Sequence, residues 1–219
     1  MKIPAFHNII FDLDGTLLDS KRDIAAAQLF VLKQFGIHHH KPEDIYPHIG
    51  KTTREIYEIF LPTEFHNRLQ EAHEIYLNYY RPRALETTQL FPGVREALIF
   101  LHSNRIRLSV ATTKSTMTTQ RILDHFGISR FFDQVQDTDG TPSKPDPYII
   151  NKIVTDRFWI PVETLMVGDS DRDIEAGRNA GIRTCGVTYG AFTRLQMEQC
   201  HPDYIIDDIF SLTTIIFQS

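Results

Sequence analysis

Residues 6–19 read FHNIIFDLDGTLLD, a short apolar run that ends in two carboxylates and a glycine. A continuous apolar run of this length, closed by a turn signal, favours a strand buried on both faces. Asp12 and Asp14 are two residues apart, so on extended backbone their side chains point the same way. Buried carboxylates repel each other, and a hard divalent cation held by oxygen ligands would offset that repulsion. The motif alone leaves two interpretations open, a metal site and a solvated turn, because Asp and Gly dominate turns.

The region that follows this strand predicts helices only. Ser20 or Asp19 can cap a helix that runs to about Phe35, and Thr52 or Thr53 can cap the next. In that second helix we expect Ile56, Ile59 and Phe60 to face inward. A third helix is predicted from Pro62 to Tyr80, and residues 81–84 are expected to form a linker. Residues 19–81 therefore predict an all-helical subdomain inserted directly after a strand.

From residue 91 onward strands and helices alternate. Predicted strands cover residues 106–111, 132–135, 164–167, 183–187 and 203–206. One predicted helix begins near Gly93. Further helices are predicted at residues 115–126, 146–157, 171–180 and 209–217. This alternation is typical of an α/β fold, a doubly wound parallel sheet with helices on both faces. We assign residues 1–18 and 82–219 to this α/β core.

Polar side chains stand where the predicted strands end, which is where ligands bind in such sheets. Thr112 and Thr113 follow one strand, where a hydroxyl and free N–H groups can hold an anion or cap the next helix. Lys144 lies between prolines in a stiff loop, which suits a point charge for a phosphate, although most single lysines are only solvated. Asp169 ends another strand and is expected to bind a metal. Asp173 falls in the first turns of the next helix, where the helix dipole also favours acids.

Taken together, these groups predict phosphoryl transfer. Paired carboxylates, a third carboxylate, a hydroxyl and a lysine at one crevice suit an anionic substrate bridged by Mg²⁺. One carboxylate can attack phosphorus and form an aspartyl phosphate. A second can protonate the leaving oxygen and then accept a proton from water.

The order of these motifs resembles the haloacid-dehalogenase-like hydrolases, specifically their phosphatases. The four motifs, which span nearly the whole chain, are Asp12-Leu13-Asp14-Gly15-Thr16, Thr112, Lys144, and Gly168-Asp169 with Asp173. The third motif departs slightly from the family's common form, with Ser143 in place of glycine before Lys144.

The resemblance implies a role for each residue. Asp12 would be the nucleophile and Asp14 the general acid and base, with Thr112 and Lys144 at the phosphate. Asp12, Asp169 and the Asp14 backbone carbonyl would bind Mg²⁺, and Asp173 would support that site. The inserted helices resemble the family's α-helical cap. Gly50 and Lys51 match the substrate-facing cap loop of phosphoglycolate-phosphatase-like members.

Several functional alternatives share part of this pattern. A β-phosphoglucomutase-like sugar phosphomutase has the same core residues and differs in which acceptor takes the phosphoryl group. Dehalogenase chemistry is disfavoured because dehalogenases of this superfamily lack an acid at the Asp14 position. A phospho-accepting receiver module also pairs acids, Thr and Lys on a parallel sheet, but it is about half as long and carries its phosphoacceptor on a mid-chain strand.

Composition and charge limit which partners the protein is expected to bind. The net charge of -5 gives no basic footprint for nucleic acid, and no apolar run approaches the roughly 20 residues of a membrane helix. The N-terminus shows no secretory signal, and the two cysteines are too few for a disulfide framework, so a cytoplasmic location is expected. The expected partner is a small phosphorylated metabolite. The sequence leaves a monomer and a homodimer both open.

Overall fold

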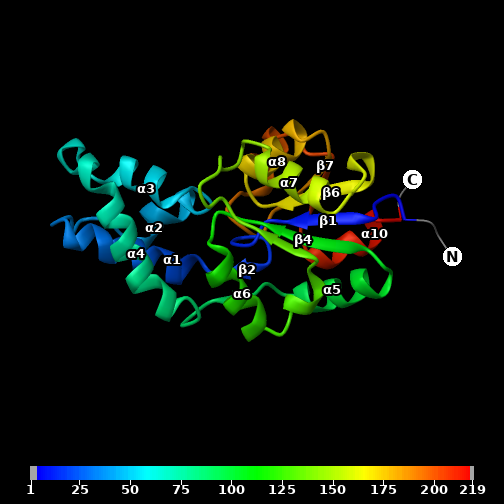
Figure 1. The fold of residues 1–219 in the computed structure, drawn as a ribbon, viewed down its shortest axis with the longest axis horizontal. Helices are drawn as coiled ribbons and strands as arrows, with labels where there is room; N and C mark the ends of the chain where they lie inside the picture. Colours follow the sequence, from blue (N-terminus) through cyan, green and yellow to red (C-terminus); the bar gives the residue numbers. More distant parts are fainter. Residues whose placement is uncertain (1–3, 218–219) are drawn as a thin grey trace.

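A six-stranded parallel sheet forms the centre of the chain. The computed structural model describes residues 4–217, and within them the sheet has the order β5-β4-β1-β6-β7-β8 (Figure 1). The strands are β1 (Asn8–Phe11), β4 (Arg107–Ala111), β5 (Gln134–Gln136), β6 (Thr164–Gly168), β7 (Arg183–Val187) and β8 (Tyr204–Ile206). β1 pairs with β4 on one side and with β6 on the other. The strand predicted from residues 6–19 is therefore the central strand of the sheet, and all four of its residues are buried.

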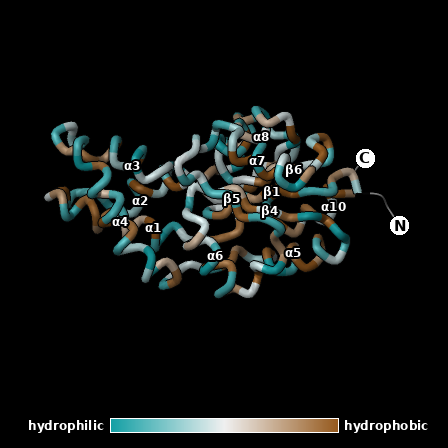
Figure 2. The backbone as a smooth tube through the Cα atoms, viewed as in Figure 1, coloured by the Kyte–Doolittle hydropathy of each residue, from teal (hydrophilic) through white to brown (hydrophobic). Residues whose placement is uncertain are grey.

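Helices cover both faces of the sheet, as the doubly wound pattern predicts. Alternate β1 residues pack on opposite faces, because Ile9 and Phe11 belong to one buried cluster and Ile10 to another. The larger cluster lies against α5 (Val94–Ser103), α6 (Thr116–His125) and α10 (Leu212–Ile215). The smaller lies against α7 (Tyr148–Asp156) and α8 (Asp171–Asn179), and α9 (Arg194–Gln199) packs near β7 and β8. Figure 2 shows hydrophobic segments running through these central strands.

The inserted helices gather at one end of the molecule, beyond the carboxyl ends of the strands (Figure 1). They are α1 (Lys21–Gln34), α2 (Pro42–Ile45), α3 (Thr53–Phe60) and α4 (Leu69–Arg83), with 3₁₀ turns at Tyr46–His48 and Thr63–Arg68. Where this region joins the core, β2 (Leu18–Asp19) pairs antiparallel with β3 (Gln89–Leu90). The buried Asp23 carboxylate accepts hydrogen bonds from the N–H and hydroxyl groups of Thr87 and Thr88. These contacts hold the outgoing connection against α1. The assignment of residues 19–81 to a separate helical subdomain stays a prediction. Residues 1–3 and 218–219 lie outside the part of the chain that the structure describes.

Several boundaries differ from the sequence predictions. The expected linker at residues 81–84 is wrong, because α4 continues through Pro82 and ends one residue later, at Arg83. Ile59, expected inside, is 52% exposed because α3 has only eight residues and buries Ile56 and Tyr57 instead. The strand predicted at 132–135 lies at residues 134–136, and the helix predicted from 146 begins at Tyr148. Across residues 4–217, no helix is long and apolar enough to cross a membrane.

Candidate active site

The centre of the site is a buried cluster of three carboxylates and one ammonium group. Asp12 follows β1, Asp169 follows β6, and Asp173 lies in the first turn of α8. One carboxylate oxygen from each of the three lies within 4.8 Å of the others. Lys144 Nζ donates hydrogen bonds to Asp12 Oδ1 at 2.5 Å, to Asp173 Oδ1 at 2.6 Å and to the Ala111 carbonyl at 3.1 Å. Four residues that the sequence places up to 161 positions apart therefore meet at one edge of the sheet.

Burial perturbs the protonation of this cluster. Desolvation raises the pKa of Asp12 to about 7, although the attraction of Lys144 opposes that rise. Desolvation also raises the pKa of Asp169 well above its ordinary value, helped by repulsion from Asp12 and Asp173. Burial lowers the pKa of Lys144, but the charges of Asp12 and Asp173 more than reverse this effect and raise it overall. When all three carboxylates are ionised, their charge exceeds that of Lys144, and a bound cation would relieve the excess.

Two glycines allow the carboxylates to approach the backbone closely. Gly15 has a φ of +97°, and a Cβ at this position would lie 1.9 Å from Asp169 Oδ2. A Cβ at Gly168 would lie 2.2 Å from the Asp173 Cβ. Asp169 is further fixed by the Ala191 N–H, which donates to Oδ2 at 2.7 Å, and Asp173 Oδ2 accepts from the Ser170 hydroxyl at 2.7 Å. Every side-chain donor that this arrangement offers a metal is a carboxylate oxygen, which fits Mg²⁺.

Asp14 has different partners from Asp12. Extended backbone ends at Phe11, and a turn follows in which the Leu17 N–H donates to the Leu13 carbonyl. Asp14 Oδ1 accepts hydrogen bonds from the Ser20 hydroxyl at 2.5 Å and from Lys114 Nζ at 2.7 Å. Its carboxylate also lines a cavity of about 400 Å³. The two carboxylates of the first motif therefore have separate surroundings, which separate chemical roles require.

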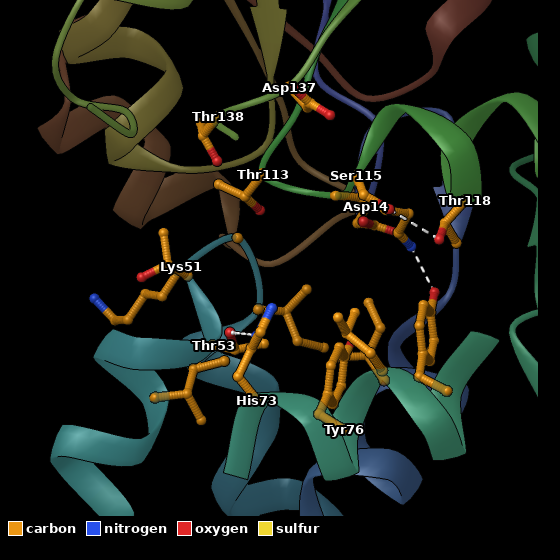
Figure 3. Close-up of a pocket in the computed structure, with 18 of the residues that line it drawn as sticks. Asp14, Lys51, Thr53, His73, Tyr76, Thr113, Ser115, Thr118, Asp137 and Thr138 are labelled. Atoms are coloured by element: carbon orange, nitrogen blue, oxygen red, sulfur yellow. Dashed lines mark hydrogen bonds and ion pairs between the residues drawn. The ribbon is translucent and has the colours of Figure 1, made fainter. Parts of the chain in front are cut away.

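The cavity lies between the carboxyl end of the sheet and the inserted helices (Figure 3). Thr113 lines it from the core, and Gly50 and Lys51 line it from the helical region. Thr112 is buried beside it, where its hydroxyl accepts a hydrogen bond from the Lys114 N–H at 3.1 Å. Figure 3 shows Asp14 and Thr113 on one side of the cavity and His73 and Tyr76 on the other. Of the predicted substrate-binding residues, Thr113, Gly50 and Lys51 line this cavity, whereas Thr112 and Lys144 do not.

Sequence reasoning missed several contacts at this site. Lys114 Nζ bonds both Asp14 and the hydroxyl of Tyr80, a buried α4 residue, at 2.5 Å. Its position directly after Thr112 and Thr113 at a strand end was the available signal. Thr16 donates a 3.4 Å hydrogen bond to Asp169 Oδ1. Ser20, which sequence reasoning treated only as a helix cap, forms no side-chain cap and donates to Asp14 instead.

Comparisons with known proteins agree with this geometry. A family model described as "Haloacid dehalogenase-like hydrolase" matches residues 9–187. A phosphoglycolate phosphatase from Aquifex aeolicus is 34% identical over 184 residues, which are 83% of this chain and 84% of the relative. The pyrophosphatase PpaX of Bacillus mycoides is 29% identical over 211 residues, 96% of each chain.

Solved structures give the same result. A haloacid dehalogenase-like family hydrolase from Streptococcus pneumoniae superposes with a TM-score of 0.87 at 27% identity, covering 98% of this chain and 99% of that one. The prediction of a phosphatase on a doubly wound α/β core is confirmed, and the receiver-module alternative is set aside. The chain belongs to the haloacid dehalogenase-like hydrolases and is a phosphatase of that family.

Proposed function

We propose that this chain is a Mg²⁺-dependent phosphatase that hydrolyses small phosphorylated metabolites through an aspartyl phosphate on Asp12. The phosphoglycolate-like and sugar phosphate monoesters are the candidate substrates. One observation carries the proposal: a buried Asp12–Lys144–Asp173 network stands beside Asp169 at the strand ends, with Asp14 facing an adjoining cavity.

In the first half of the reaction, an Asp12 carboxylate oxygen attacks phosphorus and the bond to the ester oxygen breaks. Asp14 gives its proton to that departing oxygen, so the alcohol leaves neutral. Lys144 lies 2.5 Å from Asp12 and offsets negative charge on the transferring phosphoryl group. The Thr112 hydroxyl and the loop N–H groups around Thr113 are assigned to the phosphoryl oxygens.

In the second half, water attacks the phosphorus of the aspartyl phosphate and gives a proton to Asp14. The bond between the Asp12 oxygen and phosphorus breaks, which releases inorganic phosphate and restores Asp12 as a carboxylate and Asp14 as the protonated acid. The separate partners of the two side chains support this division of roles, because only Asp14 lines the cavity in which a leaving group would lie.

The donor set fits a magnesium ion. Asp12, Asp169 and the Asp14 backbone carbonyl would hold it, with Asp173 in support. Asp12, Asp169 and Asp173 bring hard carboxylate oxygens within 4.8 Å of one another, and Lys144 supplies only one positive charge against the three carboxylates. When bound, the ion supplies positive charge to the phosphoryl group during transfer. Lys144 and the Ser170 hydroxyl keep Asp173 oriented for this purpose.

The helical region is proposed as a cap that selects the substrate. Gly50 and Lys51 lie on its cavity-facing loop, and Lys51 would meet the part of the substrate that is remote from phosphorus. The relatives bear the names of a phosphoglycolate phosphatase and a pyrophosphatase, both of which indicate small phosphorylated substrates.

A panel of phosphate esters tests the function. Pure protein with Mg²⁺ is incubated with each ester, and free phosphate is measured. We expect phosphate release from at least one small ester, and Asp12→Asn should abolish it. Conversion of a hexose phosphate into its isomer without phosphate release would favour the phosphomutase alternative and overturn the proposal.

A further inference from the structure

Within residues 4–217, one ion pair joins the inserted helices to the core. Arg172, in the first turn of α8, directs its guanidinium toward the carboxylate of Glu55, in the first turn of α3. The Nη1–Oε1 distance is 2.9 Å and the Nη2–Oε2 distance is 3.4 Å. The two side chains are 15% and 34% exposed. A two-pronged contact between partly buried charges is geometrically specific, unlike most single surface ion pairs.

Glu55 also fixes the loop that precedes it. Its Oε2 accepts hydrogen bonds from the Thr52 N–H at 2.7 Å and from the Thr52 hydroxyl at 2.8 Å, while the Glu55 N–H donates to Thr52 Oγ1. This reciprocal arrangement caps α3. Gly50 and Lys51 come immediately before Thr52 and line the cavity. The carboxylate that meets Arg172 therefore also holds the end of the cavity loop.

On the core side, Arg172 reaches the loop that carries the buried lysine. Arg172 Nη2 donates to the Ser143 hydroxyl at 3.1 Å, and Ser143 directly precedes Lys144. Arg172 itself directly precedes Asp173, which Lys144 contacts. Arg172 Nε is buried and has no hydrogen-bond partner among the described residues. The orientation of its guanidinium thus depends on Glu55 and Ser143.

We propose that Glu55 and Arg172 form a latch that holds the cavity loop over the core and couples it to the position of Lys144. Arg172 acts as a positioning residue: when the helical region is docked, its guanidinium is held by Glu55 and in turn holds Ser143. When the helical region moves away, Arg172 loses the partner that orients it, and the lysine loop loses that support. The kinetic consequence rests on the proposed phosphatase function, whereas the structural consequence does not.

Three substitutions isolate the latch. Glu55→Gln removes the charge that Arg172 needs but keeps a residue that can complete the helix cap, since Gln also serves there. Arg172→Met removes the guanidinium and keeps an unbranched apolar stem. Glu58→Gln is the matched control, because Glu58 lies on the same helix and its ion pair with Arg54 is local and exposed, 76% for Arg54 and 42% for Glu58.

The first measurement is the distance between the two parts. Spin labels on Asn67→Cys in the helical region and Asn151→Cys in α7, both at exposed positions, with Cys200→Ser, report it by pulsed electron paramagnetic resonance. We expect Glu55→Gln and Arg172→Met to broaden the distance distribution toward longer values, and Glu58→Gln to match the parent. Distributions identical to the parent in both latch variants would overturn the latch.

The second measurement is hydrolysis of p-nitrophenyl phosphate with Mg²⁺. Each latch variant should lower kcat/KM by about fivefold, the size expected of one specific ion pair, and Glu58→Gln should leave it unchanged. The double variant Glu55→Gln/Arg172→Met should lose no more than either single variant, because both remove the same contact. Multiplied losses in the double variant would contradict the coupling. If the parent hydrolyses no ester, the proposed function fails, and the distance measurement still tests the latch.

Discussion

Replacing the nucleophile should abolish turnover and yet stabilise the metal-free protein. Burial raises the pKa of Asp12 from 3.8 to about 7, so holding this carboxylate ionised in the folded protein costs free energy. Asn has nearly the same size, carries no charge and resembles the protonated acid. Asp12→Asn should therefore remove that cost while leaving an oxygen that can accept from Lys144.

The magnitude follows from the pKa difference of about three between 3.8 and about 7. Each pKa unit corresponds to about 1.4 kcal/mol, so Asp12→Asn should raise the free energy of unfolding by up to about 4 kcal/mol at pH 8. Between pH 4 and pH 7 the folded wild type binds a proton at Asp12 that the unfolded chain has released. The gain should therefore be smaller at lower pH, about 2 kcal/mol at pH 5, and should vanish below pH 4.

Urea denaturation in EDTA at pH 5 and pH 8 measures this difference. Asp124→Asn, an exposed position on α6, is the control for the change of net charge and should alter stability by less than about 0.5 kcal/mol. A loss of stability in Asp12→Asn at pH 8, or a gain that does not change with pH, would refute the electrostatic reasoning.

Three further predictions concern the same site. Lys144→Met should lower the free energy of unfolding of the metal-free protein by about 3–5 kcal/mol, because it leaves buried carboxylates unpaired. The control Lys152→Met removes an exposed ion pair within one helix and should lower the free energy of unfolding by less than about 0.5 kcal/mol. Equal losses in the two variants would argue against a buried network. Lys114→Met should lower kcat about tenfold, since Asp14 loses its cation, and an unchanged kcat in steady-state assays would exclude that role. Mg²⁺ should raise the melting temperature more at pH 8 than at pH 5, because Asp12 is protonated at pH 5 and must lose its proton to bind; a larger shift at pH 5 would contradict this.

The sequence predicted the carboxylate and lysine cluster because parallel strands end at the same edge of a sheet. Asp12 and Asp169 follow neighbouring strands, so reading the strand ends was enough to bring them together. Lys144 follows no strand end directly, and its stiff proline loop was the signal instead. These predictions needed only local patterns and one topological rule.

Contacts between the inserted helices and the core were not predictable in the same way. The Lys114–Tyr80 and Arg172–Glu55 contacts depend on how two separately patterned regions dock, and no local periodicity encodes that arrangement. The β2–β3 pair is too short, at two residues a strand, to give an alternating pattern. The expected position of Ile59 failed because periodicity gives a helix face and not how much of a short helix is covered.

The central claim is that Asp12 takes the phosphoryl group. Acid quenching during turnover of a ³²P-labelled ester, followed by proteolysis and mass spectrometry, locates any covalent phosphate. We expect label on the peptide that contains Asp12, lost on treatment with hydroxylamine as for an acyl phosphate, and absent in Asp12→Asn. Steady turnover with no label on the protein, or label on Asp14 or Asp169, would contradict the account.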